Sequence, residues 1–180
     1  MNKQIVFLDR DGTIIEDKSY MHKVEDLEFI DNSIDGLMVL QKTHELVIVT
    51  NQSGINRGKF DYKKYSEFNE KFLKKLEENE IEIKASLFCP HAPKEKCECR
   101  KPKIKLIEDY LEEQKISLDE KNCYVIGDKT CDIKLAENLG IRGILVKTGK
   151  GGSDSEFETK PHFIADNLFK AVEHIIKNGK

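Results

Sequence analysis

The sequence predicts an α/β fold, a Rossmann-like parallel sheet with helices on both faces. Three short apolar runs without polar alternation, at residues 5–8, 46–49 and 124–126, are typical of strands buried on both sides. Amphipathic segments with helical spacing separate these runs, and strands that alternate with helices form parallel sheets. Each run ends in polar residues. Because ligands bind at the carboxyl ends of such strands, we expect a functional site there.

Length and charge narrow the functional classes. The 180 residues are most simply one domain, residues 1–180, long enough for a full hydrophobic core. The 30 basic and 33 acidic side chains leave a net charge of −3, so we do not expect nucleic acid as a partner. No apolar run approaches the ~20 residues of a membrane helix, and no signal peptide precedes the first strand. We expect a cytoplasmic monomer that acts on a small molecule away from membranes.

Two carboxylates follow the first strand. Asp9 and Asp11 come directly after residues 5–8, and Gly12 is next. Two acids this close repel each other unless a cation lies between them, which favours a hard metal such as Mg²⁺. An acidic turn is the alternative, since Asp-Gly is a common turn pair. The polar stretch at residues 16–22 leaves the same strand end, where it is within reach of a substrate.

The second strand also ends in polar groups. A helix capped by Asn32 or Ser33 leads to the apolar run at residues 46–49. Thr50 ends this run. Its hydroxyl and the backbone N–H groups that follow are suited to a phosphate oxygen, although a strand that ends in threonine is common.

A metal-binding loop is predicted after the third strand. Asp61 begins an amphipathic helix with an aromatic core stripe, and residues 83–88 form the strand. A C-x-H and a C-x-C pair then supply four soft or borderline ligands: Cys89, His91, Cys97 and Cys99. This set matches a closed tetrahedral zinc site, which stiffens the loop and leaves no open position for catalysis.

Cations and another carboxylate follow the metal-binding loop. Arg100 and Lys101 come directly after the last cysteine and suit a phosphate, Arg100 as a bidentate fork and Lys101 as a point charge. A solvated basic pair is the alternative. A helix over residues 104–111 leads to the strand at residues 124–126, and Asp128 stands at its end.

The last part of the chain continues the alternation of helices and strands. Thr130 or Asp132 begins a helix that Gly140 closes. Residues 144–146 form another strand, and residues 168–176 form a last amphipathic helix.

The motifs at the strand ends resemble those of a known family. D-x-D-G-T, the strand that ends in Thr50, Lys101 and G-D-K-x-x-x-D resemble the four motifs of the haloacid dehalogenase (HAD) superfamily of phosphatases, over nearly the whole chain. T-N-Q-S-G and the Cys-His loop with R-K-P resemble one branch of that superfamily. This branch contains the D-glycero-D-manno-heptose-1,7-bisphosphate 7-phosphatases and the histidinol-phosphate phosphatases.

The resemblance implies a role for each matching residue. Asp9 is the expected nucleophile, and Asp11 is the expected general acid and base. Asp9, the backbone carbonyl of Asp11, and Asp128 would bind a catalytic Mg²⁺. Thr50 and Lys101 would hold the phosphoryl group.

A cap domain is not expected, because a loop, a helix and a strand occupy residues 14–49, and the other usual cap position holds the zinc loop. Specificity is therefore expected from surface loops. The candidate substrate-binding residues are Asp17, Lys18, Ser19, Tyr20, Asn51, Gln52, Ser53, Arg100 and Lys129.

The substrate is expected to be a heptose bisphosphate. Residues 27–31, 51–55, 57–60 and 148–150 resemble the heptose enzymes, whereas the short span from His91 to Cys97 and residues 103–106 resemble the histidinol enzymes. The resemblance implies release of the 7-phosphate of D-glycero-D-manno-heptose 1,7-bisphosphate in ADP- or GDP-heptose biosynthesis, for lipopolysaccharide core or surface polysaccharide.

Two alternatives stay open. Histidinol phosphate carries a cationic amine that favours a neighbouring carboxylate. Ser53 is neutral where the histidinol branch typically has Asp, but Glu16 or Asp17 can supply that acid. The other alternative is a zinc-stabilised scaffold that binds phosphorylated partners without catalysis.

Overall fold

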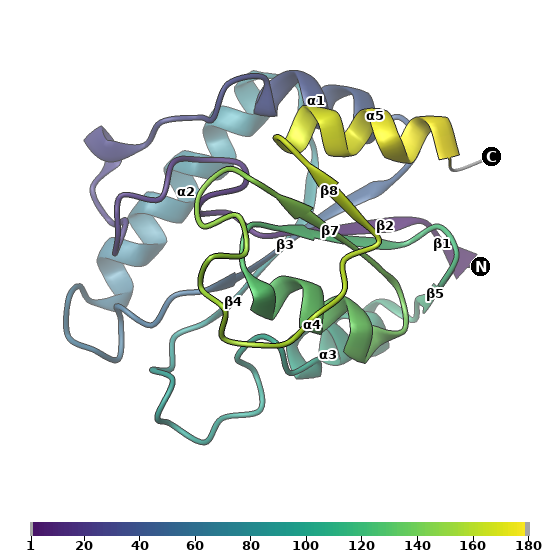
Figure 1. Ribbon diagram of the computed structural model, residues 1–180. Helices are drawn as coiled ribbons and strands as arrows, with labels where there is room; N and C mark the ends of the chain where they lie inside the picture. The colour runs from purple at the N-terminus through teal and green to yellow at the C-terminus, as the bar shows by residue number, and fades with distance from the viewer. Residues whose placement is uncertain (1, 179–180) are drawn as a thin grey trace.

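The computed structural model describes residues 2–178, and its central feature is a six-stranded parallel sheet (Figure 1). The strand order is β4-β3-β2-β6-β7-β8, and each neighbouring pair is parallel. The strands are β2 (Ile5–Leu8), β3 (Glu45–Asn51), β4 (Ile83–Cys89), β6 (Tyr124–Gly127), β7 (Arg142–Val146) and β8 (Phe163–Ala165). The predicted parallel α/β fold is confirmed.

Helices cover both faces of this sheet. In Figure 1, α1, α2 and α5 lie on one side of the strands and α3 and α4 lie on the other. Their bounds are α1 (Ser33–Leu40), α2 (Tyr62–Glu78), α3 (Lys105–Gln114), α4 (Thr130–Leu139) and α5 (Leu168–Asn178). The three-layer arrangement buries both faces of the central strands.

The two faces of β2 pack into different cores. Val6 and Leu8 belong to a cluster with side chains of α1, α2 and α5. Ile5 and Phe7 belong to a second cluster with side chains of α3 and α4. Successive side chains of a strand point to opposite faces, so a strand between two helical layers is apolar at every position. This is why the run at residues 5–8 has no polar alternation.

The helix ends follow the predicted positions with one difference. Asp61 caps α2, because its side chain accepts a hydrogen bond from the backbone N–H of Lys64 at 2.8 Å. Gly140 ends α4 in the left-handed conformation, with φ 69°. Asn32 precedes α1 but has φ 62° and makes no side-chain cap bond, so it turns the chain into the helix without capping it.

Short elements escaped the sequence analysis. A two-stranded sheet pairs β1 (Asn2–Lys3) with β5 (Ser117–Leu118), and a 3₁₀ turn forms at Val24–Asp26. β8 is three residues long and lies at the sheet edge, where half of Ile164 is exposed. Segments of two or three residues are too short to show a hydrophobic period.

The segments between strands contain little beyond connections. Residues 9–44, all of them described, form loops, the 3₁₀ turn and α1. Among residues 2–178, no helix combines the length and the apolar character that crossing a membrane requires.

Candidate active site

Three strand ends meet at one edge of the sheet. β2 lies between β3 and β6, and all three run in the same direction. Asp9 follows β2, Thr50 lies near the end of β3, and Asp128 follows β6. The backbone N–H of Asp9 donates to the carbonyl of Ile126 at 2.9 Å, which extends the pairing up to the site. The parallel sheet therefore brings together three residues that the sequence analysis selected separately.

Lys101 lies at the centre of this edge and is buried. Its Nζ donates to Oδ1 of Asp9 at 2.7 Å and to the carbonyl of Val49 at 2.7 Å, and it lies 2.6 Å from Oδ1 of Asp132. The first two contacts are hydrogen bonds, and the third is an ion pair. Burial by itself lowers the pKa of Lys101, but the carboxylates of Asp132 and Asp9 outweigh it and raise the pKa. Lys101 is therefore a fixed cation.

Asp9 is buried yet ionised. Burial acts to raise the pKa of Asp9, but the charges of Lys101 and Lys129 outweigh it and lower the pKa. An ionised carboxylate is the form that can act as a nucleophile.

Asp9, Asp128 and Asp132 form a compact carboxylate cluster. Each offers one oxygen, and the three atoms lie within 4.8 Å of one another. Asp128 is fully buried, and its Oδ1 has no hydrogen-bond partner among the described residues. Burial and the charge of Asp9 raise the pKa of Asp128 to about 8. A buried carboxylate oxygen without a hydrogen-bond partner, close to a second carboxylate, suits a hard cation, so the residues fit Mg²⁺.

Glycine lets the loop after β7 approach Asp128. Gly149 has φ +59°, and a Cβ built there would lie 2.3 Å from Oδ2 of Asp128. The next residue, Lys150, donates its backbone N–H to the same oxygen at 2.7 Å. A residue with a side chain at position 149 would therefore push the loop away from the carboxylate cluster.

We expect Mg²⁺ to stabilise the protein more strongly as pH rises. The pKa of Asp128 is about 8 in the metal-free fold, against an ordinary value of 3.8. Between these values the folded protein binds more protons than the unfolded chain, so the free energy of unfolding falls as pH rises. Mg²⁺ competes with the same proton, so its affinity increases over that range.

Thermal unfolding with and without Mg²⁺ measures this effect. At about 100 times its Kd, Mg²⁺ contributes ~2.7 kcal/mol, which corresponds to a Tm increase of about 5–10 °C above pH 8. The increase should be several-fold smaller near pH 5.5, where Asp128 is protonated. Asp128→Asn serves as the control and should show no such dependence. A Tm shift that is equal at both pH values would contradict this assignment.

Asp11 is held by two neighbouring side chains. Arg10 donates from Nε to Oδ1 and from Nη2 to Oδ2, both at 3.0 Å. Gln52 donates from Nε2 to Oδ2 at 2.7 Å and to Oγ1 of Thr50 at 2.9 Å. Arg10 is not among the predicted site residues, because its place between two carboxylates in the sequence does not show which side chain its guanidinium contacts.

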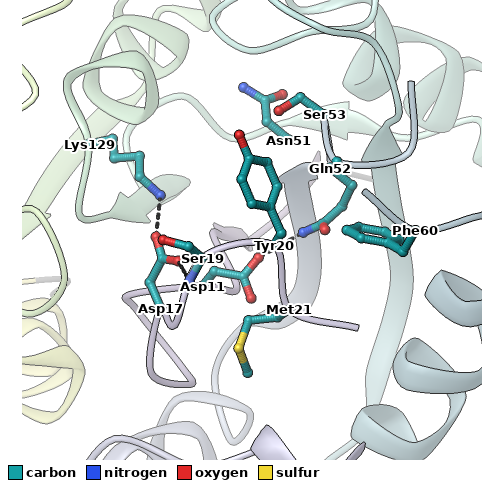
Figure 2. A pocket seen from close by; sticks show the side chains of 11 residues that line it. Asp11, Asp17, Ser19, Tyr20, Met21, Asn51, Gln52, Ser53, Phe60 and Lys129 are labelled. Atoms are coloured by element: carbon teal, nitrogen blue, oxygen red, sulfur yellow. Dashed lines mark hydrogen bonds and ion pairs between the residues drawn. The ribbon is translucent and has the colours of Figure 1, made fainter. Parts of the chain in front are cut away.

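Two cavities with shared walls open at this edge. The inner cavity, of about 200 Å³, is lined by Asp9, Asp11, Thr50, Asn51, Ser53, Arg100, Lys101, Lys129, Cys131 and Glu156. The outer cavity, of about 230 Å³, is lined by Asp11, Asp17, Ser19, Tyr20, Met21, Asn51, Gln52, Ser53, Gly54, Phe60 and Lys129 (Figure 2). Asp11, Asn51, Ser53 and Lys129 line both, so the two cavities form one polar cleft with Asp9 of the carboxylate cluster at its inner end.

All but one of the predicted substrate-binding residues line this cleft. Lys18 is the exception, because it is exposed and pairs with Glu28 at 2.8 Å. The side-chain amide of Asn51 also contacts the backbone of Lys101. Its Oδ1 accepts from the N–H of Lys101 at 3.0 Å, and its Nδ2 donates to the carbonyl of Lys101 at 3.3 Å. Lys129, which follows β6, is connected to the loop after β2 by an ion pair with Asp17 at 3.2 Å, visible in Figure 2.

Glu156 is a cleft residue that the sequence analysis missed. It lies in the long loop between β7 and β8 and lines the inner cavity. The same loop is attached to α4 by Asp154, which accepts hydrogen bonds from the backbone N–H and the hydroxyl of Thr130. No motif surrounds Glu156, so only the folded loop reveals its position.

The predicted zinc ligands converge at the end of β4. Sγ of Cys89 lies 3.2 Å from Sγ of Cys99 and 3.8 Å from Sγ of Cys97. Nδ1 of His91 lies 3.1 Å from Sγ of Cys99. One ligand atom from each residue lies within 4.8 Å of all the others. Three sulfurs and one imidazole nitrogen at these separations fit a tetrahedral zinc site.

Known proteins are similar to this chain in sequence. A family model described as HAD-hydrolase-like matches residues 98–171. D-glycero-beta-D-manno-heptose-1,7-bisphosphate 7-phosphatase from Haemophilus ducreyi is 35% identical, over 97% of this chain and 100% of the relative. The histidine biosynthesis bifunctional protein HisB from Actinobacillus pleuropneumoniae is also 35% identical, over 80% of this chain but 40% of the relative.

The fold is also similar to a crystal structure that holds ligands. D,D-heptose 1,7-bisphosphate phosphatase from B. bronchiseptica, complexed with magnesium and phosphate, aligns with a TM-score of 0.85 and 25% identity. The alignment covers 97% of this chain and 98% of that protein.

Proposed function

This chain belongs to the D-glycero-D-manno-heptose-1,7-bisphosphate 7-phosphatase family of HAD-like hydrolases, and we propose that it is a Mg²⁺-dependent phosphatase that releases the 7-phosphate of a heptose 1,7-bisphosphate. The pairing of Asp9 with Lys101 beside the carboxylate of Asp128 carries the proposal. A nucleophile, a cation for the phosphoryl group and a metal-binding carboxylate are what phosphomonoester hydrolysis requires. The product would serve ADP- or GDP-heptose biosynthesis.

Asp9 is the nucleophile in this proposal. One of its oxygens bonds to phosphorus while the bond from phosphorus to the sugar oxygen breaks. The departing sugar oxygen takes a proton from Asp11. Water then attacks the phosphorus of the aspartyl-phosphate and gives a proton to Asp11. The bond to Asp9 breaks, and inorganic phosphate leaves. The covalent intermediate divides one difficult displacement into two easier steps.

Positive charge stabilises the transferring phosphoryl group. Nζ of Lys101 lies 2.7 Å from Oδ1 of Asp9, so its charge is next to the position that phosphorus would occupy. The hydroxyl of Thr50, which also lines the inner cavity, would donate to a phosphoryl oxygen. Asp9, Asp128 and the carbonyl of Asp11 would hold Mg²⁺, which adds positive charge at the phosphoryl oxygens when it is bound.

Cations at the rim of the outer cavity support a substrate with a second phosphate. Arg57 donates from Nη1 to the hydroxyl of Tyr20 at 3.1 Å, and Nζ of Lys59 lies 5.8 Å from the centre of the Tyr20 ring. Tyr20 itself lines the outer cavity. Arg100, the predicted phosphate fork, lines the inner cavity beside Lys101 and not the outer one. We propose that Arg57 and Lys59 contact the second phosphate and that Arg100 acts nearer the reacting one.

Histidinol phosphate is the second candidate substrate. Glu156 in the inner cavity supplies a carboxylate that suits its ammonium group. Asp17, which lines the outer cavity and could also supply this acid, already pairs with Lys129. The cations at the rim would repel the ammonium group, so we rank this substrate second.

A substrate panel tests the proposal, and Arg57→Ala tests the rim. The panel contains both anomers of heptose 1,7-bisphosphate, histidinol phosphate, p-nitrophenyl phosphate and a 3′-phosphorylated oligonucleotide, with phosphate release measured in Mg²⁺. We expect the highest kcat/KM for a heptose bisphosphate. Because an exposed rim contact is worth about 1–2 kcal/mol, Arg57→Ala should raise KM for the bisphosphate by about 10-fold and leave p-nitrophenyl phosphate unaffected.

Lys170→Ala is the matched control for a lost surface cation. Lys170 lies on α5, pairs with Glu173 at 2.7 Å and does not line the cleft, so this variant should behave like the wild-type enzyme. Faster turnover of histidinol phosphate would overturn the heptose assignment but keep the chemistry. Preference for the oligonucleotide would overturn the small-molecule assignment. Binding of these compounds without any phosphate release would identify a non-catalytic scaffold.

A further inference from the structure

We propose that Arg10 and Gln52 are positioning residues for Asp11, and that they leave Oδ1 of Asp11 as the atom that exchanges protons with the leaving group and the attacking water. This inference rests on the proposed function, because it assigns Asp11 the acid and base roles of phosphomonoester hydrolysis. It also changes the predicted role of Gln52, which the sequence analysis assigned to the substrate.

Arg10 is fixed by the core of the protein. Its side chain is fully buried, and its guanidinium carbon lies 4.8 Å from the centre of the Phe68 ring on α2. Within residues 2–178, Asp11 is the one carboxylate at ion-pair distance from it. A buried guanidinium needs an anionic partner, and a two-point contact also fixes the plane of the carboxylate. The packing of α2 against Arg10 therefore sets the orientation of Asp11.

Gln52 has no amide N–H left for a substrate. The side chain is almost fully buried, and its Nε2 donates both to Oδ2 of Asp11 and to Oγ1 of Thr50. A primary amide nitrogen carries two N–H bonds, so these contacts use both. The backbone N–H of Gln52 donates to the carbonyl of Cys89 at 2.7 Å, which fixes the residue against the end of β4. Gln52 thus links the phosphate-binding hydroxyl to Asp11.

The hydrogen bonds of Asp11 distinguish its two oxygens. A carboxylate has about four acceptor positions, two on each oxygen. Oδ2 accepts from Arg10 and from Gln52, whereas among residues 2–178 only Arg10 donates to Oδ1. The one free acceptor position is therefore on Oδ1. Part of the Asp11 side chain is exposed, and the residue lines both cavities, so this carboxyl group is accessible from the cleft.

The same oxygen serves both steps without rotation of the carboxyl group. In the first step, the proton on Oδ1 moves to the sugar oxygen as its bond to phosphorus breaks. In the second step, water gives a proton back to Oδ1 as its oxygen bonds to phosphorus. Oδ2 accepts hydrogen bonds from Arg10 and Gln52 throughout, because these donors fit both the ionised and the protonated acid. The acid is thus held in place for both proton transfers.

The leaving group of the substrate provides the test. A sugar alkoxide must be protonated as it leaves, whereas p-nitrophenolate leaves as an anion. The variants are Gln52→Leu, which removes the amide donors, and Arg10→Lys, which keeps the charge but removes the fork. Single-turnover formation of the aspartyl-phosphate is measured for p-nitrophenyl phosphate and for the sugar phosphate that the wild-type enzyme hydrolyses fastest. We expect about 10–100-fold slower reaction of the sugar phosphate and less than about 3-fold change for p-nitrophenyl phosphate.

Gln41→Leu is the matched control. Gln41 also uses its amide in two hydrogen bonds, to the carbonyl of Glu80 and from the N–H of Glu82, but it lies away from the cleft. This variant should leave both rates unchanged. Equal losses with the two substrates in both Gln52→Leu and Arg10→Lys, or no loss in either, would overturn the inference while the phosphatase assignment stands. A wild-type enzyme that hydrolyses neither substrate would instead overturn the proposed function.

Discussion

Asp9→Asn is expected to lower kcat for phosphomonoester hydrolysis by about 10⁴-fold or more, the scale of loss seen when a catalytic nucleophile is removed. The amide is a poor nucleophile, and the ionised carboxylate that Lys101 stabilises is lost. The fold should persist, because the amide oxygen still accepts from Lys101 and Lys101 keeps its contact with Asp132. Steady-state phosphate release measures the loss.

Mass spectrometry of acid-quenched enzyme tests the covalent step directly. The wild-type protein should gain one phosphoryl group during turnover, and Asp9→Asn should gain none. Asp109→Asn is the control for loss of an acidic charge, because Asp109 lies on α3 and pairs with Lys105 at the surface. Substantial activity in the Asp9 variant, with Asp109→Asn normal, would show that another group attacks phosphorus.

Cys97→Ser is expected to remove zinc and to lower kcat by about 10–100-fold. A structural zinc site contributes folding free energy, so its loss should disorder the loop between β4 and α3. That loop delivers Lys101 to Asp9, and the amide of Asn51 holds only the backbone of Lys101 in place. Elemental analysis should find about one zinc per wild-type chain and almost none in the variant.

Separate controls distinguish the two metals. Cys123 lies outside the zinc cluster, and its buried sulfur accepts a hydrogen bond from the backbone N–H of Ile5. The Cys123→Ser variant should therefore keep the zinc. Mild EDTA should stop the wild-type reaction, and Mg²⁺ alone should restore it, because Asp9 and Asp128 supply hard oxygen ligands. Restoration by zinc but not by Mg²⁺ would reverse the metal assignments.

The sequence by itself determined the fold class and predicted which polar residues gather at one edge of the sheet. Residues 5–8 are apolar at every position because the strand has a helical layer on each side, and this pattern is visible without a structure. Asp9, Thr50 and Asp128 each follow or end such a run, so their common edge follows from parallel strands alone. The four predicted zinc ligands are close in sequence, and their spacing indicates one site.

Only the tertiary structure decided how the polar groups in the cleft are used. Asn51, Gln52 and Lys18 are alike in sequence terms, as polar residues in loops near a strand end. In the fold, Asn51 bonds the backbone of Lys101, Gln52 bonds Asp11 and Thr50, and Lys18 pairs with Glu28 away from the cleft. Hydrogen-bond partners far apart in the chain depend on how loops pack, which no local pattern encodes. For the same reason Glu156 in the inner cavity and the guanidinium of Arg10 on Asp11 could be found only in the folded chain.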